Sequence, residues 1–150
     1  MQLTREQWID RPVDEVFSFF ADAGNLETIT PPWLRFRILT PRPIEMRSGA
    51  LIDYTLRVRG LPIRWTTEIV EWTPPHRFVD RQLRGPYRLW HHLHEFFAEG
   101  NRTRMLDTVD YVLPFGPLGR LAHFGWVRRD LEQIFDYRQR QIETLFGDRS

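Results

Sequence analysis

Three of the five histidines of this chain lie in the stretch RLWHHLHEFF, residues 88–97. An imidazole can bind a metal, transfer protons near neutral pH, or orient a ligand by hydrogen bonding. Two carboxylates, Asp80 and Asp107, lie in the segments before and after this stretch. Which chemistry the histidines support therefore depends on which of these side chains share one face of the fold.

The alternation of residues 89–98 is typical of a strand, which places His91 on one face and His92 with His94 on the other. We expect the second face to point inward, because its ends are aromatic and its two polar groups can be neutral. A register shift of one residue would turn the other face of the strand inward. The inward set is then Trp90, His92, His94 and Phe96, and the alternative is Leu89, His91, Leu93, Glu95 and Phe97.

Two neighbouring segments present the same choice. In residues 78–83 the inward set is Phe78, Asp80 and Gln82, or else Val79, Arg81 and Leu83. In residues 105–111 the set with fewer charges is Met105, Asp107, Val109 and Tyr111, against Arg104, Leu106, Thr108, Asp110 and Val112. The preferred choices bring polar groups to one concave face, where Asp–His pairs would raise the histidine pKa and fix the tautomer. These groups are Asp80, Gln82, His92, His94 and Asp107.

Four interpretations of this face follow, and a wall that orients a bound ligand is preferred. Its expected ligand contacts are Tyr54, Trp65, Phe78, Asp80, Gln82, Trp90, Phe96 and Tyr111. Acid–base catalysis comes second, with His92, His94 and Asp107 as catalytic residues. A hydrogen-bond network without a ligand is the third, and a metal site is placed last, because no further ligand cluster is present. We therefore expect no metal and no cofactor.

Composition narrows the class of protein. The chain has 150 residues, 41% hydrophobic and 14% aromatic, which suits one domain over residues 1–150. A net charge of +1 gives no bulk attraction to nucleic acid. Cysteine is absent, which excludes disulfides, thiolate metal sites and a cysteine nucleophile. With no membrane-length apolar run and no signal-peptide pattern, a cytoplasmic protein is expected, and a homodimer is left open.

The elements needed to position these residues can be read from periodicity. Residues 2–10 are expected to form a strand, followed by a helix after Pro12 and a short helix over 26–30. Six strands follow, and an amphipathic helix of nearly 30 residues after Gly119 ends the chain. The strands are predicted at 34–38, 52–58, 63–69, 78–83, 89–98 and 102–113. Four arginines of the long helix are expected on a solvated face, with an anionic membrane or a partner protein as the alternative: Arg128, Arg129, Arg138 and Arg140.

Three stretches carry a resemblance over essentially the whole chain: residues 11–33, 85–96 and 107–121. The first has Pro-x-x-x-Val-Phe, then Asn-Leu-Glu, then Trp. The chain resembles the START-like (SRPBCC) superfamily, in its coenzyme Q-binding and polyketide cyclase/dehydrase branch. The resemblance implies an α+β helix-grip fold: a curved antiparallel sheet of about seven strands around a long C-terminal helix, with two short helices after the first strand.

The same resemblance implies an internal cavity between sheet and helix that binds an apolar or amphipathic small molecule, such as a lipid, quinone or polyketide. A cyclase/dehydrase-like lyase or isomerase is the alternative, and an adaptor without a ligand is a further one. Residues 60–62 and 114–119 are expected to edge the mouth of this cavity as a movable gate.

Overall fold

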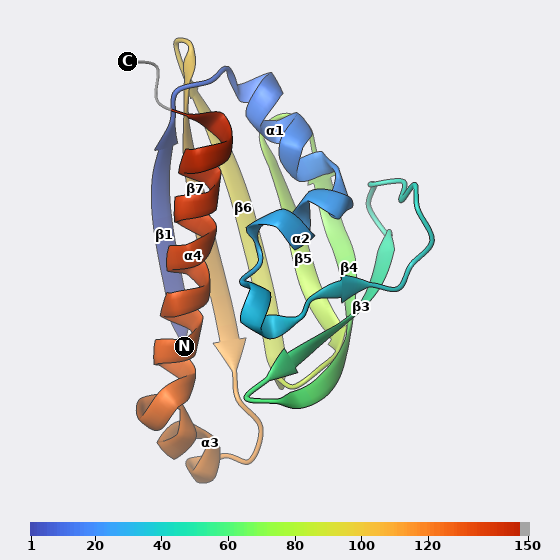
Figure 1. Ribbon diagram of the computed structural model, residues 1–150, viewed down its shortest axis with the longest axis vertical. Coiled ribbons are helices and arrows are strands. Elements are labelled where there is room, and N and C mark those ends of the chain that lie inside the picture. The colour runs from blue at the N-terminus through green and yellow to red at the C-terminus, as the bar shows by residue number, and fades with distance from the viewer. Residues whose placement is uncertain (148–150) are drawn as a thin grey trace.

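A seven-stranded antiparallel sheet curls around one long C-terminal helix in the computed structural model, which describes residues 1–147 (Figure 1). The spatial order is β1-β7-β6-β5-β4-β3-β2, so only β1 lies beside a strand distant in sequence. The helix-grip fold expected from the sequence is confirmed. The strands are β1 Gln2–Ile9, β2 Arg37–Ile38, β3 Leu51–Val58, β4 Leu61–Thr73, β5 Arg77–Arg84, β6 Leu89–Glu99 and β7 Arg102–Val112.

Two short helices follow β1, as predicted. Helix α1, Val13–Ala21, begins after Pro12, and its first turn carries Asp14 and Glu15, which favour the positive end of a helix. Its inward face consists of the buried side chains of Val16, Phe17 and Phe20. Helix α2, Leu26–Ile29, lies between two 3-10 turns, Ala23–Asn25 and Pro32–Leu34.

The strand predicted at residues 34–38 is mostly wrong. Only Arg37 and Ile38 pair with β3, because the 3-10 turn at Pro32–Leu34 ends in Arg35 with a left-handed backbone (φ 47°). Leu34 and Ile38 are nevertheless buried while Arg35 and Arg37 are exposed. The alternation of apolar and polar residues therefore predicted which side chains are buried, but the segment is irregular rather than a full strand.

The long helix is confirmed, with an interruption that periodicity did not predict. Helix α3, Pro117–Ala122, and helix α4, Arg128–Phe146, are joined by a π-helical segment at His123–Val127. Gly119 is required at the start, because a Cβ there would collide with the carbonyl oxygen of Pro114. None of the helices in residues 1–147 is both long and apolar enough to span a membrane.

Aromatic packing fills one end of the space between sheet and helix. Phe17 of α1 contacts Phe78 and Phe96, with ring centroids 6.0 and 5.2 Å apart, and Phe20 also packs on Phe96. Helix α1 crosses this upper end of the sheet (Figure 1). Helix α1 and its aromatic contacts therefore cover this end of the concave face.

Candidate functional site

A cavity of about 830 Å³ lies between the concave face of the sheet, α2 and α4. This volume falls within the range usual for small-molecule sites, roughly 300–1,000 Å³. Most of its wall is aliphatic or aromatic, which favours an apolar ligand. Among the apolar lining residues are Phe20, Ile29, Leu34, Phe36, Ile52, Tyr54, Leu56, Val58, Trp65, Ile69, Phe78, Tyr87, Trp90, Leu131, Ile134 and Phe135.

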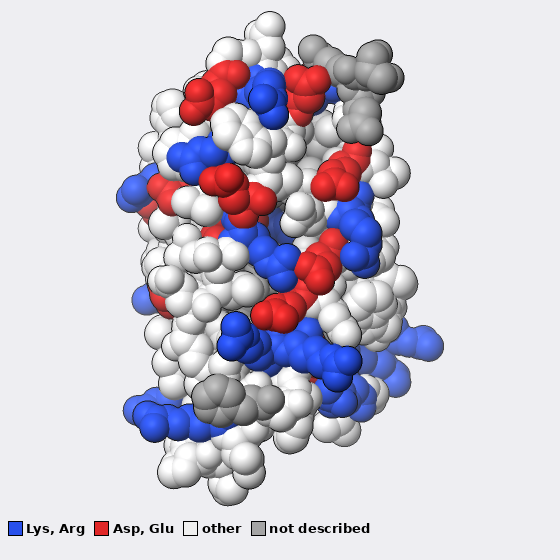
Figure 2. Space-filling model, turned by 90° about the vertical axis from the view of Figure 1, so that its left-hand side faces the viewer, with Lys and Arg blue, Asp and Glu red and all other residues white. Residues whose placement is uncertain are grey.

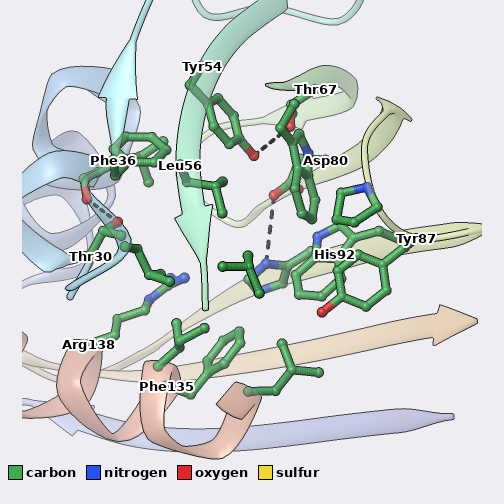
Figure 3. A pocket seen from close by; sticks show the side chains of 18 of the residues that line it. Thr30, Phe36, Tyr54, Leu56, Thr67, Asp80, Tyr87, His92, Phe135 and Arg138 are labelled. Carbon is green, nitrogen blue, oxygen red and sulfur yellow. Dashed lines mark hydrogen bonds and ion pairs between the residues drawn. The ribbon is translucent and has the colours of Figure 1, made fainter. Parts of the chain in front are cut away.

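Polar side chains from the sheet and from α4 (Arg128–Phe146) meet beside the cavity, and we call these five residues the polar cluster: Asp80, His92, His94, Asp107 and Arg138. Nε2 of His92 lies 2.8 Å from Oδ1 of Asp107, and Nε2 of His94 lies 2.6 Å from Oδ2 of Asp80. Arg138 donates from Nη2 to Oδ1 of Asp107 at 3.4 Å. Figure 3 shows Arg138 reaching in from α4, opposite Asp80 and His92 on the sheet. Each buried charge therefore has an opposite charge or a hydrogen bond.

The strand register explains this pattern. Asp80 on β5 stands directly opposite His92 on β6, and His94 stands opposite Asp107 on β7. Both histidine–carboxylate hydrogen bonds nevertheless run diagonally, from His94 to Asp80 and from His92 to Asp107. Diagonal neighbours are within reach of long side chains across a sheet. The two histidines thus tie three adjacent strands together.

Ring stacking fixes the orientation of the imidazoles. The rings of His92 and His94 are stacked with centroids 3.6 Å apart, and Phe78 stacks on the other face of His94 at 4.0 Å. Two imidazolium ions at this distance would repel each other strongly. The stack therefore favours a state in which only one of the two histidines is charged.

Both carboxylates are held ionised. Burial alone would raise the pKa of Asp107, but the Arg138 charge and the hydrogen bonds from His92 and His94 outweigh it and hold that pKa well below its ordinary value. For Asp80, burial is likewise outweighed by the hydrogen bond from His94 and the nearby positive charges, so its pKa is also lowered. The cluster therefore carries two fixed negative charges at neutral pH.

The pKa values of the two histidines are shifted in opposite directions. Burial lowers the pKa of His92 to about 4, helped by the charge of His94 and only partly opposed by Asp107. Burial also acts against protonation of His94, but contacts with Asp107 and Asp80 overcome it and raise its pKa. When His94 is protonated, its charge and that of Arg138 balance the two carboxylates, and the cluster is then neutral with His92 uncharged. An acid and a base thus lie side by side.

Three side chains of the polar cluster have the geometry of a metal-ligand set. Asp80, His92 and His94 offer three ligand atoms within 4.8 Å of one another, a set known from iron and zinc sites. In this structure Nε2 of His94 is engaged with Asp80, and the positive charge of Arg138 lies beside the group. Because a cation would have to displace that hydrogen bond, the residues fit the hydrogen-bonded cluster better than a metal centre.

Of the predicted site residues, most line the cavity. They are Tyr54, Trp65, Phe78, Asp80, Trp90, His92 and His94. Asp107 is buried behind the two histidines and joins the cluster without lining the cavity. Gln82, Phe96 and Tyr111 do not belong to the described wall.

Each of these three exceptions has a structural reason. The Gln82 side chain donates to the carbonyl oxygen of Tyr87 and accepts from its amide, which braces the β5–β6 turn. Phe96 is only 1% exposed, inside the aromatic core beside α1. The Tyr111 hydroxyl lies 2.7 Å from Nε2 of His123, in a separate buried contact beneath α3. Inward orientation was predicted correctly for Phe96 and Tyr111, but the cavity does not extend to them.

Arg138 lines the cavity, although its place in the sequence predicted a solvated face of the long helix. Its side chain is only 12% exposed and contacts Asp107. The spacing Leu131, Phe135, Arg138, Ile142 follows the buried stripe of α4, with steps of four, three and four. This periodicity was the available signal.

Exposed residues line the cavity at the β3–β4 turn and near the start of α4, and we call this end of the cavity its mouth. Arg59 and Gly60 line it from the turn, and Trp126 and Asp130 line it from the helix. Arg59 bridges the two sides with hydrogen bonds to both carboxylate oxygens of Asp130, at 3.2 and 3.1 Å. Residues 114–119 are absent from the described wall, and the movable gate stays a prediction.

Known structures share this fold at low sequence identity. A protein described as TTHA0849 from Thermus thermophilus is 19% identical, with a TM-score of 0.71 and 97% of each chain covered. The Zhui aromatase/cyclase from a Streptomyces species, R1128, is 19% identical with a TM-score of 0.70, covering 95% of this chain and 93% of that one. Ara h 8.0201 is 13% identical with a TM-score of 0.66, covering 96% and 98%.

These likenesses bear on the fold alone, and no protein of curated function matches the chain in sequence. The family described as "Polyketide cyclase / dehydrase and lipid transport" matches residues 1–143, nearly the whole chain. The chain belongs to the polyketide cyclase/dehydrase and lipid transport family of the START-like (SRPBCC) superfamily.

Proposed function

We propose that this protein binds an apolar or amphipathic small molecule, such as a lipid, quinone or polyketide, inside the cavity between its sheet and α4. The observation that carries the proposal is a cavity of about 830 Å³ whose wall is mostly apolar, with members of the polar cluster as its buried polar patch. An apolar ligand would gain about 25 cal/mol for each Å² that it removes from water. Membership of a ligand-binding family supports the same conclusion.

The polar cluster would orient the ligand. Asp80 and Arg138 are its most accessible members, with side chains 17% and 12% exposed, whereas His92 and His94 are at 6% and 4%. A ligand head group would therefore meet a carboxylate and a guanidinium on opposite walls. A molecule with one oxygen-bearing end and an apolar body fits this arrangement better than a pure hydrocarbon.

A cavity-filling variant tests the proposal. Anilinonaphthalene sulfonate is a suitable probe, because its rings match the wall, its anion matches Arg138, and its fluorescence rises in apolar surroundings. Leu56→Trp places a bulky side chain in the cavity, and an overpacking cost of about 1–3 kcal/mol would weaken probe binding by at least about fivefold.

The matched control is Leu51→Trp on the same strand. Leu51 is 52% exposed and does not line the cavity, so this variant should bind the probe like the wild-type protein. Equal affinity in Leu56→Trp and wild type would mean that the probe binds elsewhere, and the proposal would fail.

A second candidate function is acid–base catalysis, which is favoured by the opposite pKa shifts of His92 and His94. His92, with its lowered pKa, and His94, with its raised pKa, offer a base and an acid whose ring centroids lie 3.6 Å apart in a buried site. Such a pair suits proton abstraction next to a carbonyl group, as in a cyclisation or dehydration.

Deuterium incorporation next to the carbonyl of a bound aryl ketone measures this chemistry without knowledge of the natural substrate. His92→Gln should abolish the exchange while the ketone still binds. Exchange at the wild-type rate in His92→Gln would leave binding as the better account. A cytoplasmic location and a homodimer stay predictions from the sequence.

A further inference from the structure

The cavity mouth lies at one end of the sheet, and three segments far apart in sequence meet there. Because successive strands are antiparallel, the β3–β4 turn, the β5–β6 turn and the C-terminal end of β7 lie at the same end of the sheet. Helix α3 follows β7 and lies at the lower tip of the molecule (Figure 1). Residues from all three segments, among them Gly60, Tyr87 and Leu113, line the cavity.

This end is basic, although the whole chain is nearly neutral. Residues 57–61, 84–89 and 111–129 hold seven arginines and no aspartate or glutamate. Figure 2 shows blue side chains gathered in the lower third of one face, with the red side chains above them. The arginines are Arg57, Arg59, Arg84, Arg88, Arg120, Arg128 and Arg129.

Most of these charges are available to a partner. Arg59 is paired with Asp130, and Arg128 lies 3.4 Å from Glu132. Within residues 1–147, the other five arginines of this end form no ion pair. They therefore present uncompensated positive charge around the mouth.

Beyond the basic residues lies an apolar tip. Phe115 is 81% exposed, and Leu118 and Leu121 are each 71% exposed. Leu61 in the β3–β4 turn is exposed as well. Large apolar side chains gathered at one exposed end mark an interaction site, because isolated ones would be scattered.

We infer that this end docks on the surface of an anionic lipid membrane, with Phe115, Leu118 and Leu121 inserted and the arginines over the head groups. Apolar residues at a tip with arginines just behind them match the layering of a bilayer interface. A second copy docking through the same end would bring two basic surfaces together, which disfavours a symmetric dimer there. A ligand could then pass between the bilayer and the cavity mouth, a step that rests on the proposed function.

Vesicle sedimentation with the full chain tests the inference. We expect binding to phosphatidylcholine vesicles that contain phosphatidylglycerol, at least about tenfold weaker binding to pure phosphatidylcholine, and loss of binding at about 1 M salt. Arg120→Gln and Arg129→Gln should each weaken binding about fivefold, and Phe115→Ser with Leu118→Ser more than about tenfold.

Two matched controls lie elsewhere on α4. Leu145→Ser changes an exposed leucine at the far end of the helix, and Arg140→Gln changes an exposed arginine outside the basic end. Both should bind like wild type, and circular dichroism should show every variant folded. Bromine-labelled acyl chains should quench wild-type fluorescence more than that of Trp126→Phe, because Trp126 lies at the mouth.

The inference is overturned if the vesicles do not bind, if neutral vesicles bind equally well, or if the controls weaken binding as much as the tip variants. Binding of this end only to an acidic protein would also overturn it. Docking and the cavity function can fail separately, since probe binding that Leu56→Trp weakens, and Phe115→Ser with Leu118→Ser does not, reports the cavity. Probe binding without vesicle binding removes only the membrane step, and vesicle binding without probe binding removes only the cavity function.

Discussion

Asp107 is the residue whose removal should disturb the polar cluster most. It is 3% exposed and lies within 2.8 Å of His92, 3.3 Å of His94 and 3.4 Å of Arg138. When His94 is protonated, Asp107→Asn leaves two positive charges, on Arg138 and His94, against Asp80 alone. Breaking a buried charge pair in this way costs about 3–5 kcal/mol.

Part of that cost is recovered if His94 releases its proton, which restores a neutral cluster. We therefore expect a loss near the lower limit, about 3 kcal/mol of unfolding free energy at about pH 7, together with a fall in the His94 pKa. For a chain of this size, such a loss lowers Tm by roughly 6–12 °C. Chemical denaturation gives the free energy, and nuclear magnetic resonance titration gives the pKa.

The pH dependence provides a sign test. The folded pKa of Asp107 lies well below its ordinary value, so its stabilisation is present above the unfolded pKa of about 3.9. That stabilisation is lost as the pH falls through the folded pKa. The difference between wild type and Asp107→Asn should therefore shrink as the pH drops below about 4.

Asp110→Asn is the control, on the same strand but on the outer face, where it accepts a hydrogen bond from Gln2. A surface change of this kind should alter stability by less than about 0.5 kcal/mol. If Asp107→Asn costs less than about 1 kcal/mol, or no more than Asp110→Asn, the interpretation of a tightly coupled charged cluster is refuted.

Three further predictions follow from single contacts. The folded pKa of His92, about 4, lies below its unfolded value, so the free energy of unfolding should fall as the pH drops from about 6.5 to about 4. His92→Gln should flatten this slope, which denaturation curves at several pH values measure. An unchanged slope would contradict the prediction. Arg138→Met should cost about 3 kcal/mol by leaving a buried carboxylate without its cation, whereas Arg140→Met on the solvated side should cost under about 0.5 kcal/mol; equal Tm values would refute the role. Gly119→Ala should lower Tm because its Cβ would collide with a backbone carbonyl. In the control Gly125→Ala the new Cβ meets nothing within 4 Å, so the change should be neutral or stabilise by up to about 1 kcal/mol. A lower Tm for Gly125→Ala than for Gly119→Ala would count against the packing described for α3.

The fold was predictable because long periodic segments dominate it. Strict alternation in β6 and β7 fixed which side chains face inward, and the burial of His92, His94 and Asp107 followed correctly from it. The helix after Gly119 could also be predicted, because its apolar residues recur at helical spacing. Where the backbone is irregular, as at Pro32–Leu34, the same alternation predicted burial but not the strand.

The site was predictable only in part, because it depends on how far the cavity extends. Alternation shows that Phe96 and Tyr111 face inward, but not that α1 packs over one and His123 bonds the other. Charged residues are rarely buried, so Arg138 was assigned to the surface despite its place in the helical stripe. Its burial depends on Asp107, a partner on a strand 31 residues earlier in the chain, which no local pattern reveals.

Native mass spectrometry of the gently purified protein tests the central claim, a ligand held in the cavity, most directly. We expect a protein mass increased by a small organic molecule that solvent extraction releases, and a much reduced fraction of this species in Leu56→Trp but not in Leu51→Trp. A bare protein mass in all three, combined with wild-type protein that does not bind anilinonaphthalene sulfonate, would contradict the claim.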